Sequence, residues 1–445
     1  MAAIAAAQEN TDAEVMVVTQ DRLPYRRPAI PALIAGYIKG PEGAKVFSPE
    51  TLAQYNVKLI CPVEATDIDP KTKVISILSD GKKEKLPYDA AVIATGSHPL
   101  IPKILGADKK GVCTFTTYEA AAEIVEVAKT ASCAVVVGAG FIALEIAEAL
   151  MHKGLDVYFN VRSRILRRLL EPDVSEFLSR KFEQQRLKML TGEAISEIGG
   201  KSSVEYVVHK GKKIATSLVV MGTGVKPNVA LAEKCGIELG PTGAIKVDSR
   251  MQTSAPDIYA VGDCAESLDL GTGRFVYSPV GSIGAAAGRV AGKNAAGANQ
   301  ETKGFLRAQA DHILGMQIFS IGHSTTSAKE VDLKVDVHDL TVPASAEKTR
   351  ERTLFQTAKL LTDTNGKIVG AQLVAKKFGS QFAWQLYQAV LRGENRKEFL
   401  RRFNSPRMKV AQALVQAVKS TVTIENVGED KALKLVDAVS RKKTN

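Results

Sequence analysis

One short stretch of this sequence constrains its fold more than any other. Residues 134–145 read AVVVGAGFIALE, in which an apolar run passes into Gly138-x-Gly140-x-x-Ala143 and then into a helix-forming segment. Gly138 permits a tight turn, Gly140 lets an anion approach the backbone, and Ala143 allows the helix to pack closely on the strand. The free N–H groups at the helix start face that anion. The motif predicts a dinucleotide site; the alternative is a glycine turn with a purely structural role.

The flanking sequence supplies the context that such a site requires. We expect a strand over residues 133–137, a helix to about Lys153, Gly154 as its stop and a second strand over residues 155–161. Strands that alternate with helices indicate a parallel, doubly wound sheet, so the predicted fold class is α/β. The other expected elements are strands over residues 15–18, 90–96 and 258–263, and a hairpin with arms at 204–208 and 214–221 and a turn at 210–213.

The end of the second strand bears on the choice of nicotinamide cofactor. An NAD site usually presents an acidic residue about 20 residues after the motif, where it holds the ribose 2′-hydroxyl. Residues 157–164 read VYFNVRSR, with no acid and with Arg162 and Arg164. A guanidinium binds a 2′-phosphate well, whereas a carboxylate repels it. We therefore predict NADP, with NAD as the second choice; the alternative is that both arginines only cover the surface.

The pattern changes after about Glu301, which indicates a separate C-terminal domain of α+β type. A second hairpin is expected there, followed by two helices. The hairpin joins residues 354–361 to 367–374 across the DTNG turn at 363–366, and the helices cover 381–391 and 408–418.

Charge and cysteine content narrow the partners and the compartment. The net charge is +11, with an excess of Lys and Arg over residues 391–445. Such a tail can contact nucleic acid, a membrane or an acidic protein, but a solvated helical face is the simpler interpretation, and no nucleic-acid-binding module accompanies it. No apolar run approaches the ~20 residues of a membrane helix, and no signal peptide is evident. The 5 cysteines lack paired spacing and the 6 histidines are scattered, which favours reduced thiols in a cytoplasmic protein without a metal site.

Three further stretches resemble the FAD-dependent pyridine nucleotide–disulfide oxidoreductase superfamily. They read YDAAVIATGSHP at residues 88–99, GTGVKPN at 222–228 and TSAPDIYAVGDCAE at 253–266, in the order typical of the family. The resemblance implies two Rossmann-like dinucleotide-binding domains, an interface domain and a homodimer. The implied bounds are residues 1–110 and 235–303 for the FAD domain, 111–234 for the inserted NAD(P) domain, and 304–445 for the interface domain.

The same resemblance implies roles for matched residues. Asp263 would hydrogen-bond the ribityl chain of FAD, unless it is only a turn aspartate. Phe141 would cover the nicotinamide side of the flavin as a gate and Glu145 would lie near the nicotinamide; core packing and a capping carboxylate are the alternatives for these two. The other implied cofactor-binding residues are Thr95 and Gly96 in the FAD turn, Gly224 in the GTGVKPN stretch, and Gly281, Ser282 and Ile283 at the start of a helix whose positive end faces the flavin.

Residues 23–35, LPYRRPAIPALIA, resemble the YxRP stretch of rubredoxin, ferredoxin and nitrite reductase flavoproteins. Tyr25, Arg27 and Pro28 match, and the resemblance places Arg27 near the FAD. Disulfide- and coenzyme A-reducing members carry a cysteine just after this point, where residues 28–30 of this chain read PAI.

Further departures affect the expected chemistry. Cys264 follows the flavin segment but is expected to be a small buried filler, and residues 403–407 show no His–Glu pair like that of glutathione-reductase relatives. Because a thiol relay needs a sulfur beside the flavin, direct transfer is favoured. We expect a hydride to pass from NADPH to FAD, and electrons then to pass to a small redox protein such as rubredoxin or ferredoxin, a quinone or oxygen.

The N-terminus departs from the family pattern as well. Residues 1–7 read like the middle of the first helix, after the usual GxGxxG, and Thr19 stands where a ribose-binding glutamate is usual. We expect either an upstream extension that carries a strand and the glycine motif, or impaired FAD binding. The competing hypothesis is a non-catalytic nicotinamide-nucleotide-binding subunit or sensor without flavin.

Overall fold

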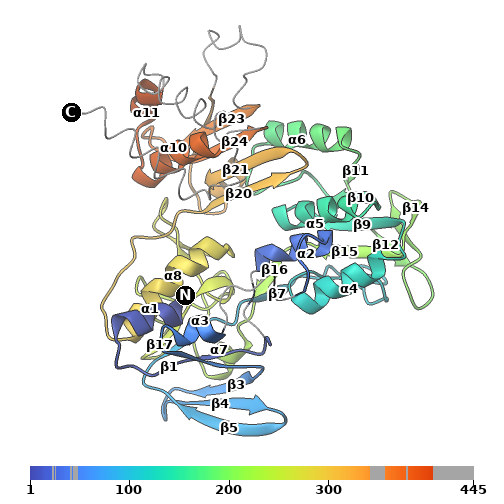
Figure 1. Cartoon of the computed structure of the whole chain (residues 1–445). Helices are drawn as coiled ribbons and strands as arrows, with labels where there is room; N and C mark the ends of the chain where they lie inside the picture. Colours follow the sequence, from blue (N-terminus) through green and yellow to red (C-terminus); the bar gives the residue numbers. More distant parts are fainter. Residues whose placement is uncertain are drawn as a thin grey trace.

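The structure, a computed structural model, describes residues 1–22, 25, 27–40, 43, 49–340, 356–376 and 379–403. Its elements gather in three regions (Figure 1). One is built from the N-terminal residues and the segment that ends in helix α8, one surrounds a parallel sheet, and one surrounds an antiparallel C-terminal sheet. The α/β class predicted from the sequence is confirmed, because helices alternate with parallel strands through the first two regions.

A five-stranded parallel sheet carries the glycine motif, in the order β11-β10-β9-β15-β8. β9 is central, so both of its faces are covered and residues 134–136 are fully buried. The predicted strand, glycine loop, helix and second strand are confirmed. The bounds of this region are β8 (Val112–Cys113), α4 (Tyr118–Ala128), β9 (Cys133–Gly138), α5 (Phe141–His152), β10 (Asp156–Val161), α6 (Pro172–Gln184), β11 (Lys188–Thr191) and β15 (Leu218–Gly222).

The hairpin predicted within residues 204–221 is partly wrong. Its first arm lies in β13 (Tyr206–His209), which pairs with β14 (Lys212–Ala215). The chain then leaves this antiparallel layer, and β15 joins the parallel sheet beside β9. The physical reason is burial, because residues 218–221 are at most 1% exposed. A run that is apolar on both faces is typical of a central parallel strand and not of a hairpin with one solvated face.

The N-terminal helix α1 (Ala2–Glu9) lies against α8 (Gly281–Ala295), although they are far apart in the sequence (Figure 1). The approach is close because Gly292 has no side chain: a Cβ there would stand 2.1 Å from the Ala2 carbonyl oxygen. Two parallel strand pairs belong to this region, β1 (Val15–Val18) with β2 (Val57–Ile60), and β17 (Ile258–Ala260) with β6 (Ala91–Ile93).

The other elements that precede the C-terminal sheet are short. They are the 3-10 helices η1 (Arg27–Ala29) and η3 (Gly262–Cys264), the helices α2 (Ile30–Ala35), α3 (Pro49–Ala53) and α7 (Ala230–Lys234), and the strands β3 (Glu64–Asp69), β4 (Val74–Ser79), β5 (Lys82–Pro87), β7 (Ser97–Pro99), β12 (Glu197–Gly199), β16 (Val225–Pro227), β18 (Ser267–Leu268) and β19 (Phe275–Val276).

The C-terminal sheet is antiparallel, in the order β20-β21-β24-β23-β22. The predicted second hairpin is present as β23 paired with β24. Residues 354–355 of its first arm, the helix predicted over 408–418 and the basic tail after residue 403 lie outside the described residues. Within the described part of the chain, we find no helix with the length and apolarity needed to cross a membrane. The bounds are β20 (Ala308–Ile313), β21 (Met316–Gly322), α9 (Thr325–Lys329), β22 (Asp336–Asp339), β23 (Thr357–Thr362), β24 (Ile368–Ala375), α10 (Gly379–Arg392) and α11 (Arg396–Phe403).

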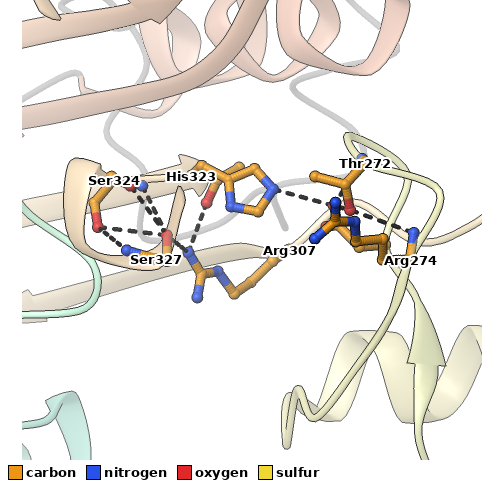
Figure 2. Close-up of polar contacts among 8 residues, drawn as sticks. Thr272, Arg274, Arg307, His323, Ser324 and Ser327 are labelled. Atoms are coloured by element: carbon orange, nitrogen blue, oxygen red, sulfur yellow. Dashed lines mark hydrogen bonds and ion pairs between the residues drawn. The ribbon is translucent and has the colours of Figure 1, made fainter. Parts of the chain in front are cut away.

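A buried polar network joins the C-terminal sheet to the loop of residues 269–274 (Figure 2). His323 Nε2 lies 3.1 Å from Asp269 Oδ2, and both side chains are at most 10% exposed. Arg307 donates to Ser327 Oγ over 2.9 Å at the other end of the network. Because buried polar groups cost free energy unless they are paired, the network favours a single arrangement of the two regions.

The short helix α9 also reaches the parallel-sheet region. Thr325 donates from its backbone N and its Oγ1 to the Glu171 carboxylate, over 2.8 and 2.7 Å. Ser324 Oγ donates to the Arg168 carbonyl oxygen over 2.9 Å, and the helix begins with a capping box formed by Ser324 and Ser327. The segment that starts at His323 therefore contacts both of the other regions.

Candidate functional site

The glycine loop is shaped by close backbone approach. A Cβ at Gly138 would stand 2.2 Å from the Gly222 carbonyl oxygen and 2.9 Å from the Ala143 Cβ. A Cβ at Gly222 would stand 2.8 Å from the same Ala143 methyl group. Strands β9 and β15 and the helix α5 therefore meet at a point where no larger side chain fits. Sequence reasoning identified Gly138 and Ala143, but it did not identify Gly222 as the third member of this contact.

Gly140 has a different surrounding. It caps α5 with extended backbone angles (φ −91°, ψ 173°), and a Cβ there would have no atom within 4 Å. The space in front of the helix start is thus open. The first N–H groups of α5 have no hydrogen-bond acceptor inside the helix itself. An open, positively polarised helix start fits the pyrophosphate of a dinucleotide.

The two arginines after β10 lie in different surroundings. Arg162 is exposed. The guanidinium of Arg164 is half-buried and donates to the Leu170 carbonyl oxygen (2.6 Å), Ser175 Oγ (3.2 Å) and Thr326 Oγ1 (3.0 Å). Arg164 therefore links α6 and α9 to the end of β10, and Arg162 is the guanidinium that is open to a ligand.

Phe141 and Glu145 follow the glycine loop on one face of α5. Phe141 opens the helix and is 8% exposed within the main hydrophobic core. Glu145 lies one turn later on the same face. Burial, together with the neighbouring Asp311 carboxyl on β20, raises the pKa of the Glu145 carboxyl to about 8. This raised pKa favours the protonated form of Glu145 at neutral pH. The position of Glu145 beside a nicotinamide ring stays a prediction.

The ATG loop and the GTGVKPN stretch are tied together at Asn228. Thr95 Oγ1 donates to the Asn228 carbonyl oxygen over 2.7 Å, and Asn228 Nδ2 donates back to the Thr95 carbonyl oxygen over 2.8 Å. Gly96 has a φ of +71°, and a Cβ there would stand 3.2 Å from Arg27 Nη2. Gly224, with a φ of +106°, accepts from the Leu100 N–H over 2.9 Å. The sequence alone did not identify Asn228 as the residue that joins the two loops.

Asp263 lies in the turn η3, where it contacts both the ATG loop and the YxRP stretch. Its Oδ2 accepts from Ser97 Oγ over 2.8 Å and lies 3.8 Å from Arg27 Nη1. Its side chain is 27% exposed, so the carboxylate still reaches open space. The structure therefore brings together Asp263, Arg27 and Gly96, three residues from distant parts of the chain that the family resemblance assigned to FAD.

The start of α8 completes this group. Gly281 and Ser282 are exposed at the first turn, whereas Ile283 is buried. Just before them, Tyr277 Oη and Ser278 Oγ are buried and have no hydrogen-bond partner among the residues that the structure describes. Burial and the nearby Asp263 charge raise the pKa of Tyr277. Buried hydroxyls normally have partners, so these two hydroxyl groups, directly before an open helix start, fit a polar cofactor such as FAD. Sequence reasoning missed both residues, although they directly precede the predicted helix start.

Cys264, which follows the flavin segment, is not poised for thiol exchange. Cys264 is fully buried, its thiol donates to the Val261 carbonyl oxygen over 3.2 Å, and burial raises its pKa. At the position of the family's redox cysteine, the chain forms η1 and the start of α2 with Pro28, Ala29 and Ile30. A reactive thiolate needs a lowered pKa and exposure, and Cys264 has neither.

Comparisons with known proteins show the family to which the chain is similar. The sequence profile of the family described as "Pyridine nucleotide-disulphide oxidoreductase" matches residues 1–286. The chain is 34% identical to the NADH oxidase of Methanocaldococcus jannaschii over 377 residues, which cover 82% of each protein. It is 34% identical to the NAD(P)H sulfur oxidoreductase (CoA-dependent) of Pyrococcus furiosus over 60% of this chain and 61% of that protein. The solved NAD-dependent persulfide reductase from A. fulgidus is 28% identical, with a TM-score of 0.85 over 96% of this chain and 83% of that one.

Proposed function

Because the chain belongs to the pyridine nucleotide-disulphide oxidoreductase family, we propose that it oxidises NADPH and passes the electrons directly to molecular oxygen. The coarser statement is supported by the comparisons: the protein is an FAD- and NAD(P)-dependent oxidoreductase, and this confirms the predicted class of enzyme and both cofactors. The preference for NADPH and the identity of the acceptor are the proposal.

The residues that would hold the two cofactors lie on separate helix starts. FAD, when bound, supplies the two-electron chemistry, and the protein supplies position and electrostatics. Asp263, Arg27 and Tyr277 would hold the flavin nucleotide at the start of α8, where the positive helix end favours negative charge. The loop around Gly140 would hold the nicotinamide dinucleotide at the start of α5, and Phe141 would exclude water at the nicotinamide side.

The preference for NADPH rests on Arg162. It is exposed after β10, at the place where NAD enzymes usually carry an acid, and it can contact a 2′-phosphate through a charge-assisted hydrogen bond. Arg164 holds the loop after β10 in place through its hydrogen bonds to Leu170, Ser175 and Thr326. The relative from M. jannaschii is named for NADH, so a direct comparison of the two cofactors decides this point.

The observation that carries the choice of acceptor is the chemistry at residues 28–30. Relatives named for sulfur or persulfide substrates include proteins described as CoA-dependent. Reduction through a thiol intermediate requires a nucleophilic sulfur beside the flavin, and Pro28, Ala29 and Ile30 offer none. An acceptor that reacts directly with reduced flavin is favoured, and the M. jannaschii relative is named an oxidase. Quinones and small redox proteins are the other acceptors of this kind.

Two measurements test the proposal. The visible spectrum of the purified protein should show bound flavin, and a colourless protein that stays colourless with added FAD would contradict the flavoenzyme. An oxygen electrode should then record oxygen consumption on addition of NADPH, in proportion to enzyme. If NADPH bleaches the flavin but oxygen is not consumed, whereas a quinone or rubredoxin is reduced, oxygen is the wrong acceptor.

We also propose that the protein is a homodimer formed through its C-terminal region. Trp384 on α10 is 60% exposed and stacks on Tyr387, with ring centroids 5.5 Å apart, and Leu391 further along the helix is 40% exposed. Exposed aromatic residues are enriched at protein interfaces. Analytical ultracentrifugation should give the mass of a dimer, and Trp384→Glu should shift the equilibrium toward monomer.

A further inference from the structure

A line of ionisable side chains runs along one face of α5, away from the glycine loop. Glu145, Glu148 and His152 follow Phe141 at spacings of four, three and four residues. Helical residues three or four apart are neighbours on the same face. The line therefore leads from the helix start, where the nicotinamide would bind, to the exposed helix end at His152.

The inner end of the line is a pair of carboxyl groups. Glu145 on α5 faces Asp311 on β20, within hydrogen-bonding reach. Two carboxylates at this distance repel one another, so the pair favours a state in which they share one proton. The pair thus stores a proton at the inner end of the line.

The middle and outer parts of the line are held in place by specific contacts. Glu148 Oε1 accepts from the Leu314 N–H over 2.9 Å, at the turn after β20. Burial raises the pKa of the Glu148 carboxyl, whereas the bond from Leu314 and the nearby His312 and His152 oppose that rise. His152 Nδ1 lies 3.3 Å from the hydroxyl of Tyr37, whose side chain is 70% exposed, and the two rings are 4.7 Å apart.

We propose that Glu145 and Asp311, Glu148 and His152 form a proton path along α5, which connects the nicotinamide end of the site to solvent at Tyr37. Glu145 exchanges its proton with Asp311, Glu148 passes protons between this pair and His152, and His152 exchanges with water. Asp311 is the second carboxyl group at the inner end of the path and lies opposite Glu145, on β20.

The path matches the proton balance of the proposed oxidase reaction. Its role in catalysis rests on that proposed function. NADPH, one proton and oxygen yield NADP⁺ and hydrogen peroxide. The hydride brings two electrons and one proton, so the second proton must come from solvent. If Phe141 covers the nicotinamide side as proposed above, that proton needs a conducting group, and general acids typically contribute 10²–10⁴-fold to the rate.

A purely structural role accounts for only part of this arrangement. The bond from Leu314 explains why Glu148 is anchored, but a second carboxyl group opposite Glu145 adds repulsion and not stability. The exposed histidine at the end of the line also has no packing role in the core, because it lies at the surface beside Tyr37.

The first experiment is infrared spectroscopy of the resting enzyme, with no turnover. The wild type should show a protonated carboxyl C=O band at pH 7, which Glu145→Gln and Asp311→Asn should each remove or shift. The control is Glu183→Gln, because Glu183 is an exposed acid on α6. If the band is absent from the wild type, or is unchanged in both variants, the shared proton does not exist and the proposal fails.

The second experiment measures exchange of that proton after rapid mixing with D2O, as the downshift of the same band. Glu148→Gln and His152→Phe should each slow the exchange by roughly tenfold to a hundredfold, and imidazole added as a small proton carrier should restore it. Glu183→Gln should exchange at the wild-type rate. If both path variants exchange as fast as the wild type, solvent reaches Glu145 directly and the path is refuted. Both readouts are independent of oxygen, so the path and the oxidase proposal can fail separately.

Discussion

Replacing Arg162 with glutamate should reverse the choice of nicotinamide cofactor. Arg162 is exposed after β10, whereas Arg164 is bound to three protein acceptors. We expect Arg162→Glu to lower kcat/KM for NADPH and to leave kcat/KM for NADH equal or higher. An introduced carboxylate repels the 2′-phosphate and can accept a hydrogen bond from the 2′-hydroxyl of NADH.

The size of the effect follows from the exposure of the side chain. A charge-assisted hydrogen bond contributes about 1.5–3 kcal/mol, and an added repulsion at about 4 Å costs about 1–4 kcal/mol between the water and protein-surface limits. Because Arg162 is exposed, the lower part of each range applies, and the sum is about 2.5–4 kcal/mol, or roughly 70- to 1000-fold in the ratio of kcat/KM values. The effect should shrink as salt rises, because exposed charges are screened.

The assay is steady-state NADPH and NADH oxidation at low and high ionic strength. Lys201→Glu makes the same charge change at an exposed residue elsewhere in the region and should leave the ratio unchanged. Arg164→Ala should lower thermal stability more than it changes the ratio, since it leaves Thr326 and Ser175 without a donor. If the Arg162→Glu ratio equals that of the wild type while the Arg164→Ala ratio changes, the assignment of the two arginines is wrong.

Three further predictions concern the other parts of the site. Replacing all 5 cysteines with Ser or Ala should leave flavin reduction by NADPH nearly intact, and alkylation of Cys264 that abolishes reduction without release of FAD would contradict this. Gly140→Val should weaken NADPH binding by at least about tenfold in a titration, with little change in stability, because its Cβ enters the space expected for the pyrophosphate and touches no protein atom. For Glu145, the pKa in the folded protein is about 8, above the value of about 4.3 in the unfolded chain. The contribution of Glu145 to the free energy of unfolding is therefore full below pH 4.3 or so, about the unfolded pKa. It is lost as the pH rises to about 8, by about 1.4 kcal/mol per pH unit at most. Melting temperatures measured from pH 5 to 9 should therefore fall less steeply for Glu145→Gln than for the wild type, and parallel curves would contradict the raised pKa.

The parts of the fold that could be predicted depend on local chemistry. The strand, glycine loop and helix around Gly138 and Gly140 could be predicted because each residue's role is set by its immediate neighbours in the sequence. The hairpin at 204–221 was predicted wrongly because the exit into β15 depends on burial under two layers, which hydrophobicity along the chain does not distinguish from a hairpin arm.

The parts of the site that could not be predicted depend on distant contacts. Arg164 resembles a ligand-binding arginine in the sequence, but its partner Thr326 lies 162 positions away. Asp311 likewise meets Glu145 only because β20 packs against α5. Tyr277 and Ser278 belong to no sequence motif, and only the burial of their hydroxyls without a partner in the described part of the chain marks them.

The segment that starts at His323 restricts how the two nucleotide-binding regions can move relative to one another. Through Asp269 it is anchored to the region that contains the flavin stretch, and through Glu171 and Arg164 it is anchored to the region that contains the glycine motif. A rotation of one nucleotide-binding region relative to the other would leave several buried polar groups without hydrogen-bond partners, each at a cost of about 1–3 kcal/mol. The segment from His323 to Lys329 therefore acts as a brace that favours one relative arrangement of the two nucleotide-binding regions.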